Sequence, residues 1–141
     1  MNIKCYWDSN LKCCPYKRYI EIFFKDKDIS FNKKKKVFAI IKNKIFRIKN
    51  CKNIKCIGEL SKSLYPYNYW EIRIIKNSKK LIRITFFHDI EKREIIILDG
   101  FEKPNKDLYN QKDQYDYDSN LSKSDYYLKE YIKNKKYEEY E

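Results

Sequence analysis

The sequence contains very little glycine and histidine. Gly58 and Gly100 are the only glycines in 141 residues, and His88 is the single histidine. Glycine-rich loops that hold phosphates or dinucleotides need several residues without a Cβ, so the composition excludes such loops. One histidine likewise excludes His-rich metal sites and two-histidine hydrolytic centres. We therefore expect a protein that uses no metal and no cofactor.

Long uncharged segments are also missing. The longest stretch without Lys, Arg, Asp or Glu is 63–70, far shorter than the roughly 20 apolar residues of a membrane span. The N-terminus has no apolar segment of signal-peptide length. The chain has five cysteines, and an odd number argues against the disulfide framework of a secreted protein. The spacing of Cys51 and Cys56 does not match that of zinc ligands. We expect reduced, partly buried thiols in a cytoplasmic protein with no membrane partner.

Positive charge dominates the chain but is unevenly distributed. Lys and Arg number 32 against 20 Asp and Glu, which gives +12. Residues 107–141 carry a net charge of −3, so residues 1–106 carry +15. Abundant Lys, Asn, Ile and Tyr with one Ala are typical of an AT-rich genome, and this bias accounts for part of the charge. A basic body with an acidic, Tyr-rich tail still favours an anionic partner such as nucleic acid.

The hydrophobic pattern predicts one α+β fold. It indicates a strand over 2–7 and two helices, one starting at Pro15 and one capped by Ser30 and ending near Lys49. Three strand-like runs follow, joined by short polar turns typical of antiparallel hairpins: 69–75, 81–88 and 93–99. We expect a small antiparallel sheet with two N-terminal helices packed on it. The predicted organisation is a domain over 1–106, an acidic polar linker over 107–123 and a C-terminal helix over 124–141.

The strand-like runs resemble a known protein family. YWEIRII (69–75), LIRITFF (81–87) and IIILDGFEKP (95–104) are similar to the pattern LYELRI, YRIFYFF and IVLLHGFVKK of RelE/HigB-like toxins, in the branch that includes phage-derived toxin proteins. The spacing of Arg73, Arg83 and Gly100-Phe101 is the specific part, and the resemblance covers about residues 1–106. The chain departs from the family after Phe101 and has phenylalanine where a strand tyrosine is common.

The resemblance implies a toxin of a type II toxin–antitoxin system with a RelE-like fold. Such a toxin is a metal-independent endoribonuclease that cleaves mRNA, usually on the ribosome, and is neutralised by a cognate antitoxin protein. Two alternatives stay open. One is a toxin-fold protein that poisons another target, such as a topoisomerase. The other is a non-catalytic phage or regulatory module that binds RNA.

Arg73 and Arg83 are candidate catalytic residues. Cleaving RNA without a metal requires the 2′-hydroxyl to attack the adjacent phosphate, so cations must surround the transition state and a group must move protons. Arginines on neighbouring strands can converge on one phosphate, which suits the guanidinium fork. The alternative is that both arginines pair with Glu71 and Asp99 on a solvated face.

Several other residues are candidates for the same chemistry. His88 has the only side chain whose unperturbed pKa lies near neutrality, which makes it a candidate catalytic residue. Strand alternation, however, places it on the opposite face of the sheet from Arg83. An ordinary turn residue is the alternative. The candidates for RNA binding are lysines that can contact phosphate and aromatic rings that can stack on bases, and they are Lys79, Lys80, Lys103, Phe87 and Phe101. Solvated turn lysines and core phenylalanines are the alternatives.

Two further segments carry expectations. The lysines at 33–36, with Lys42, Lys44 and Lys49, give the second helix a basic face that would follow an RNA backbone or remain a solvated surface. In the acidic tail, Leu128, Tyr131 and Ile132 recur at helical spacing. We expect them to dock on the domain at a contact for which an antitoxin would compete; a mobile tail is the alternative.

Overall fold

The computed structural model of the chain describes residues 1–105 and 110–141. Within these residues a mixed sheet has the strand order β2-β3-β4-β5-β1-β6. Its strands are β1 (Asn2–Tyr6), β2 (Lys62–Ser63), β3 (Trp70–Ile75), β4 (Lys80–Asp89), β5 (Glu94–Pro104) and β6 (Tyr137–Glu139). The α+β class is confirmed. A purely antiparallel sheet is wrong, because β1 runs parallel to β5, from which it is separated in the chain by three helices and three strands.

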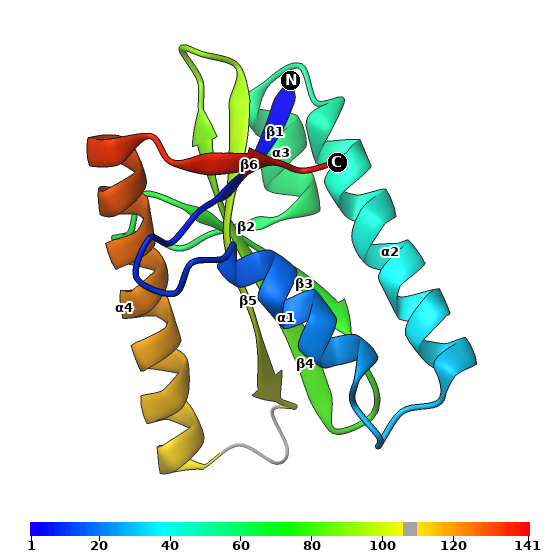
Figure 1. The fold of residues 1–141 in the computed structure, drawn as a ribbon. Coiled ribbons are helices and arrows are strands. Elements are labelled where there is room, and N and C mark those ends of the chain that lie inside the picture. The colour runs from blue at the N-terminus through cyan, green and yellow to red at the C-terminus, as the bar shows by residue number, and fades with distance from the viewer. Residues whose placement is uncertain (106–109) are drawn as a thin grey trace.

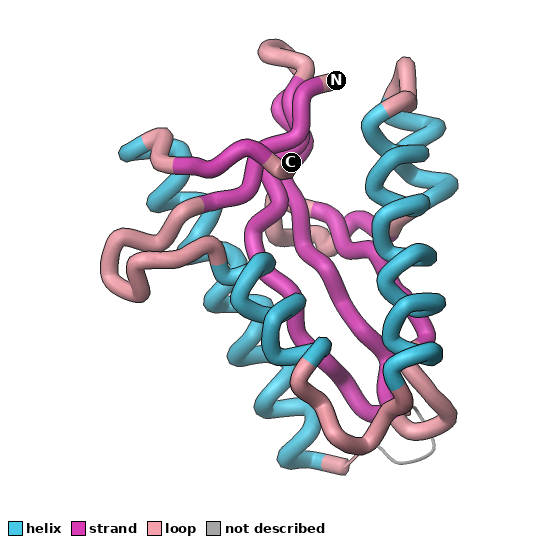
Figure 2. Tube along the Cα trace, turned by 45° about the vertical axis from the view of Figure 1, so that its right-hand side comes forward, coloured by secondary structure: helices cyan, strands magenta, loops and turns pink. Residues whose placement is uncertain are grey.

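Helices cover both faces of this sheet. They are α1 (Pro15–Phe24), α2 (Phe31–Lys49), α3 (Ile54–Leu60) and α4 (Gln111–Asn134). Figures 1 and 2 show α4 on one side of the sheet and α1 and α2 on the other. Two hydrophobic cores result. One contains Phe23 of α1 and Ile41 of α2, and the other contains Leu128 of α4.

The second helix forms where the sequence predicts it. The Ser30 side chain accepts a hydrogen bond from the Lys33 amide at 3.2 Å, which satisfies a free donor of the first turn. An apolar stripe of α2 faces the core at three- and four-residue spacing: Val37, Ile41, Ile45 and Ile48. The Met1 ammonium donates to the Lys49 carbonyl at 3.0 Å and so places a positive charge at the C-terminal end of the helix.

Side-chain alternation along β5 divides the two cores. Ile95 and Ile97 belong to the core with α1 and α2, whereas Ile96 and Leu98 belong to the core with α4. The pairing of β4 with β5 shifts between Thr85 and Phe86, where Leu98 is the extra residue. Beyond this bulge β5 continues to Pro104, past the end predicted at Asp99. The extension places Phe101 and Lys103 beside β4.

The C-terminal segment differs from the prediction. The helix α4 begins at Gln111, so residues 111–123 are helical and not a polar linker. Asn110 and Asp113 form a reciprocal capping box that fixes this start. The end also differs, because 137–139 form β6, which pairs with β1. Residues 106–109, which include the first part of the predicted linker, lie outside the described residues.

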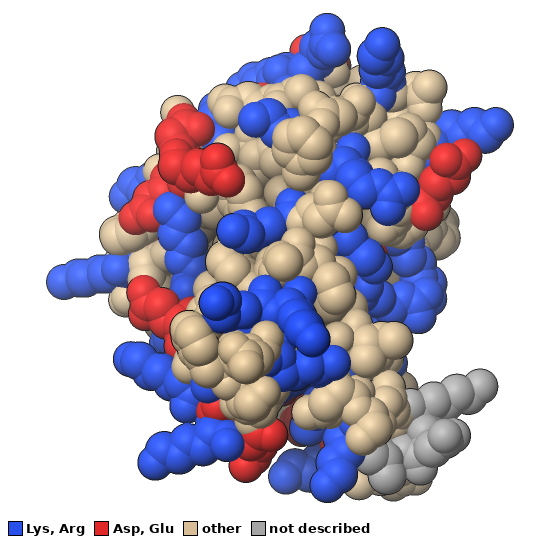
Figure 3. Space-filling model, turned by 90° about the vertical axis from the view of Figure 1, so that its right-hand side faces the viewer, with Lys and Arg blue, Asp and Glu red and all other residues tan. Residues whose placement is uncertain are grey.

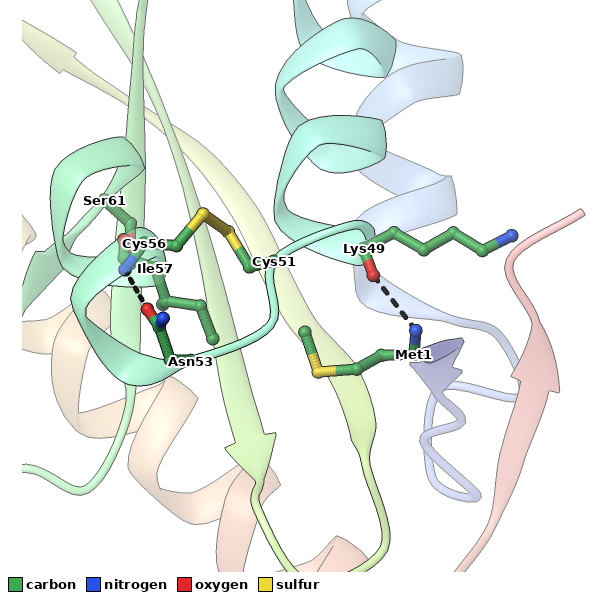
Figure 4. The surroundings of a disulfide bond; sticks show 7 residues. All are labelled: Met1, Lys49, Cys51, Asn53, Cys56, Ile57 and Ser61. Carbon is green, nitrogen blue, oxygen red and sulfur yellow. Dashed lines mark hydrogen bonds between the residues drawn. A yellow bond between two sulfur atoms is a disulfide. The ribbon is translucent and has the colours of Figure 1, made fainter.

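The prediction of reduced thiols is wrong at one pair. A disulfide joins Cys51, which follows α2, to Cys56 in α3 (Figure 4). The sequence indicated no helix over 54–60, yet the Asn53 side chain caps α3 by accepting from the Cys56 amide at 2.9 Å. This turn brings the two Cα atoms to 5.6 Å, a separation that a disulfide spans. Cys5, Cys13 and Cys14 are free cysteines.

No helix within the described part of the chain is long and apolar enough to cross a membrane. The long helices α2 and α4 carry charged residues along their length and use their apolar faces against the sheet.

Candidate functional site

Three adjacent strands bring four of the predicted residues to one face of the sheet. Arg73 of β3 lies directly opposite Arg83 of β4, and Arg83 lies opposite Phe101 of β5. Lys103 follows two residues later on β5 and therefore points to the same face. This is the face that α4 covers, since Phe101 packs in the core with α4. The register thus confirms that the two arginines are neighbours.

Arg83 is enclosed within a buried ion pair. Its guanidinium donates to the Glu71 carboxylate at 3.0 Å, and the Glu71 side chain has 0% exposure. The Tyr117 hydroxyl of α4 donates to the same carboxylate at 3.2 Å. Pairing with Glu71 was the alternative interpretation of Arg83, but the pair is buried and not solvated. Arg73, by contrast, is exposed.

Tyr117 is the residue around which the site is organised. The Lys103 ammonium lies 3.9 Å from the centre of its ring, and the Arg83 guanidinium lies 5.6 Å from it, distances that are typical of cation–π contacts. The Phe101 ring is 6.2 Å away. The sequence did not indicate this residue, because the polar pattern around it is typical of a linker. The position of this tyrosine four residues before Leu121 was the available signal for a helical face.

The cations of this site lie close enough to affect one another. Burial lowers the pKa of Lys103, and nearby Arg83, Lys62 and Arg73 lower it further, while Glu71 acts in the opposite direction. Burial and the Glu71 carboxylate raise the pKa of Tyr117 to about 12, which keeps its hydroxyl neutral. We call Lys62, Arg73, Arg83 and Lys103 the cation cluster. Its charges are suited to an anion with several oxygens.

One donor of the cluster has no acceptor in the described residues. The Arg83 Nε is buried, and no hydrogen-bond partner for it occurs in residues 1–105 and 110–141. A buried donor without an acceptor is costly, so this atom is suited to an oxygen supplied by a ligand.

Asp99 lies further along the same face. It is opposite Thr85, whose hydroxyl is 2.9 Å from the Ser124 hydroxyl of α4. The Asp99 carboxylate accepts the Gly100 amide at 2.8 Å and is only 7% exposed. Burial raises its pKa to about 7, and the weaker effects of the Gly100 amide and Lys123 oppose this rise. Asp99 does not pair with either arginine through any contact within the described residues.

His88 lies on the other face of the sheet. It lines a hollow of about 200 Å³ together with Met1, Cys51 and Arg93, beside the disulfide and α3. Burial lowers its pKa, and Asp89 acts in the opposite direction. Strand alternation predicted that His88 and Arg83 point to opposite faces of the sheet, and this prediction is confirmed. The structure therefore does not bring the His88 imidazole to the cation cluster.

The other predicted RNA-binding residues occupy different positions. Lys79 lies in the turn between β3 and β4, and Lys80 is the first residue of β4. Both are exposed, and the Asn77 side chain accepts from both of their amides. Phe87 is partly buried against the core with α4, and Phe101 is 8% exposed. Both rings therefore pack in the core, as the alternative interpretation expected.

The docking of the tail is confirmed in part. Leu128 and Tyr131 are each 3% exposed and pack on the sheet, but Ile132 is 49% exposed. The Tyr69 hydroxyl also donates to the Leu121 carbonyl at 2.6 Å. The helix α4 is thus an integral layer of the fold. Competition by an antitoxin for this contact stays a prediction.

No group of three or more His, Cys, Asp or Glu side chains with metal-binding geometry occurs in the described residues. The chain matches no family model, no curated protein and no solved structure.

Proposed function

We propose that the chain is the toxin of a type II toxin–antitoxin system, a metal-independent endoribonuclease that cleaves mRNA on the ribosome in the cytoplasm and is neutralised by a cognate antitoxin protein. The observation that carries this proposal is the cation cluster, in which Arg73, Arg83 and Lys103 converge from three adjacent strands. The similarity of these strands to RelE/HigB-like toxins supports the same proposal.

In the proposed reaction the 2′-hydroxyl attacks the neighbouring phosphate and the 5′-oxygen leaves. Exposed Arg73 and partly buried Lys103 contact the phosphate oxygens and stabilise the added negative charge. Arg83, whose buried Nε has no partner among the described residues, adds a third positive charge beside the phosphate. Lys103, whose pKa is lowered by burial and by the neighbouring cations, donates its ammonium proton to the leaving 5′-oxygen, while the proton of the 2′-hydroxyl passes to water. It replaces His88, which faces the opposite side of the sheet.

A second candidate function is an RNA-binding module without cleavage. The enclosure of Arg83 by Glu71 and Tyr117 favours it, because a guanidinium held in a buried pair is less free to follow a changing phosphate. Binding of RNA with intact substrate after long incubation would identify this function.

The proposal predicts that Arg73→Ala removes cleavage and leaves the fold intact. Loss of one preorganised cation is expected to slow cleavage about 100-fold or more, while an exposed strand position changes the free energy of unfolding by less than about 1 kcal/mol. Arg18→Ala on α1 is the matched control, because Arg18 is also exposed and lies outside the site. Rates are measured on mRNA with and without ribosomes. Equal rates for the two variants would refute the assignment of Arg73.

A further inference from the structure

Most of the excess charge of the chain lies in one segment. Residues 29–58 contain ten Lys and Arg and no Asp or Glu, whereas the whole chain has a net charge of +12. These residues include α2 and most of α3. Figure 3 shows the side of the molecule on which α2 lies, where Lys and Arg dominate the charged surface. A surface of this kind attracts a polyanion.

The lysines and arginines of α2 do not form a single group. Lys34 is buried and donates to the Phe24 carbonyl at 2.8 Å, so it is a structural residue. At 3.6 residues per turn the others form two rows on either side of the helix. The first row faces β3 and contains Lys33, Lys36, Lys44 and Arg47. The second row faces the C-terminus and contains Lys35, Lys42 and Lys49.

The second row lies beside the acidic C-terminal segment. Lys42 and Lys49 line a hollow together with Glu139 and Glu141, so carboxylates reduce the positive potential on that side. Among the described residues no salt bridge joins either row to a carboxylate, so the difference between the rows comes from the carboxylates that line this hollow. A polyanion is therefore attracted more strongly to the side of α2 that faces β3.

Lys44 connects the first row to the edge of the sheet. Its ammonium donates to the Arg73 carbonyl at 2.9 Å. The neighbouring strand β2 pairs only with Trp70 and Glu71, so β3 has a free edge at Arg73. Burial lowers the pKa of Lys44, and so do the neighbouring charges of Arg47 and Arg73. The three cations thus lie within electrostatic reach of one another at this edge.

Arg73 belongs to both basic surfaces. Its backbone contacts Lys44 of α2, and its side chain lies on the strand face that carries Arg83 and Lys103. The first row of α2, the edge of β3 and the cation cluster therefore form one continuous basic path around the sheet. We infer that this path holds a single strand of RNA, whose phosphates follow the first row of α2 and pass over the β3 edge into the cation cluster. This inference deepens the proposed function, because it assigns the direction from which the substrate enters.

The arrangement of α2 favours RNA over an anionic membrane. A helix that lies in a membrane surface needs a continuous outer apolar face. The apolar stripe of α2 is already buried against the sheet, and the exposed apolar residues Phe31, Ile40 and Phe46 point in different directions around the helix. Scattered side chains of this kind can contact bases between phosphate contacts but cannot form a membrane-inserting face.

Two double variants of the full-length protein test the path. Lys36→Gln with Arg47→Gln removes two charges from the first row, and Lys35→Gln with Lys49→Gln removes two from the second row of the same helix. The probe is a fluorescent single-stranded 2′-O-methyl oligonucleotide, which binds without being cut. The first variant is expected to lower the slope of log affinity against log salt by about 1.4 and the affinity at 0.1 M salt by about 20-fold. The second is expected to change both much less.

Equal losses from the two rows would overturn the path and indicate attraction to net charge alone. An unchanged slope in the first-row variant would also overturn it. Binding of the wild type to phosphatidylserine vesicles but not to the oligonucleotide would replace RNA by a membrane as the partner. A different result would refute the proposed function alone. If the wild type binds the oligonucleotide along the first row but never cleaves unmodified RNA, the path is supported and the ribonuclease activity is refuted.

Discussion

Arg83→Ala is expected to destabilise the protein by about 3–5 kcal/mol, because it leaves a buried carboxylate without its partner. The Glu71 side chain has 0% exposure, and it also accepts a hydrogen bond from the Tyr117 hydroxyl. Both interpretations of Arg83 in the sequence, a catalytic cation or a member of a solvated ion pair, imply an accessible side chain, whereas the structure buries it. Urea denaturation of both proteins measures the change, and a loss below about 1 kcal/mol would show that the pair is not buried in solution.

A double variant separates the stability of this pair from its function. Glu71→Leu with Arg83→Met removes both charges, and replacing a buried pair by apolar residues of similar volume is often neutral or stabilising. The double variant is therefore expected to fold about as stably as the wild type but to lose RNA cleavage. Glu71→Leu alone is the control, since it leaves Arg83 buried and unpaired. Full cleavage by the folded double variant would exclude Arg83 from the reaction.

Asp99→Asn is expected to stabilise the protein at alkaline pH. The pKa of Asp99 is raised to about 7 in the folded state by burial, above the 3.8 of an unperturbed aspartate. A raised carboxyl pKa means that folding disfavours the charged form, so stability is lost as the pH rises from about 4 to about 7. The loss is on the order of 4 kcal/mol. Asparagine keeps an acceptor for the Gly100 amide and removes the charge.

The measurement is the free energy of unfolding of both proteins between pH 4 and pH 8. At pH 4 the two are expected to agree within about 1 kcal/mol, and at pH 8 the variant is expected to be more stable by most of the predicted difference. Parallel stability curves would show that Asp99 is ionised in the folded protein at neutral pH. Asp116→Asn is the matched control, because it changes an exposed carboxyl of α4. Asp113→Asn would not serve, because Asp113 is part of the capping box of that helix.

The regular elements with strong periodicity could be predicted from the sequence. The helix α2 has an unambiguous cap at Ser30 and an apolar stripe, and the β3–β4–β5 hairpins follow from dense Ile and Phe runs with short turns. Strand alternation also placed Arg73 beside Arg83 and His88 on the other face, and the register agrees. These predictions succeeded because each rests on local pattern.

What could not be predicted depends on contacts between distant segments. The first half of α4 has a polar sequence, and it is helical because of its capping box and because Tyr117 and Leu121 pack on the sheet. The burial of Arg83 follows from that helix, which lies more than two dozen residues later in the chain. The disulfide needed the short helix α3, whose seven residues give too weak a pattern to recognise.

The most direct test of the central claim is the chemistry of the RNA ends. Purified protein is incubated with mRNA and ribosomes, and the products are compared with those from an RNA that carries a 2′-deoxy residue at the mapped cut. The proposed attack by the 2′-hydroxyl predicts cyclic 2′,3′-phosphate and 5′-hydroxyl ends and no cut at the deoxy position. Cleavage that persists at the deoxy residue would contradict the account.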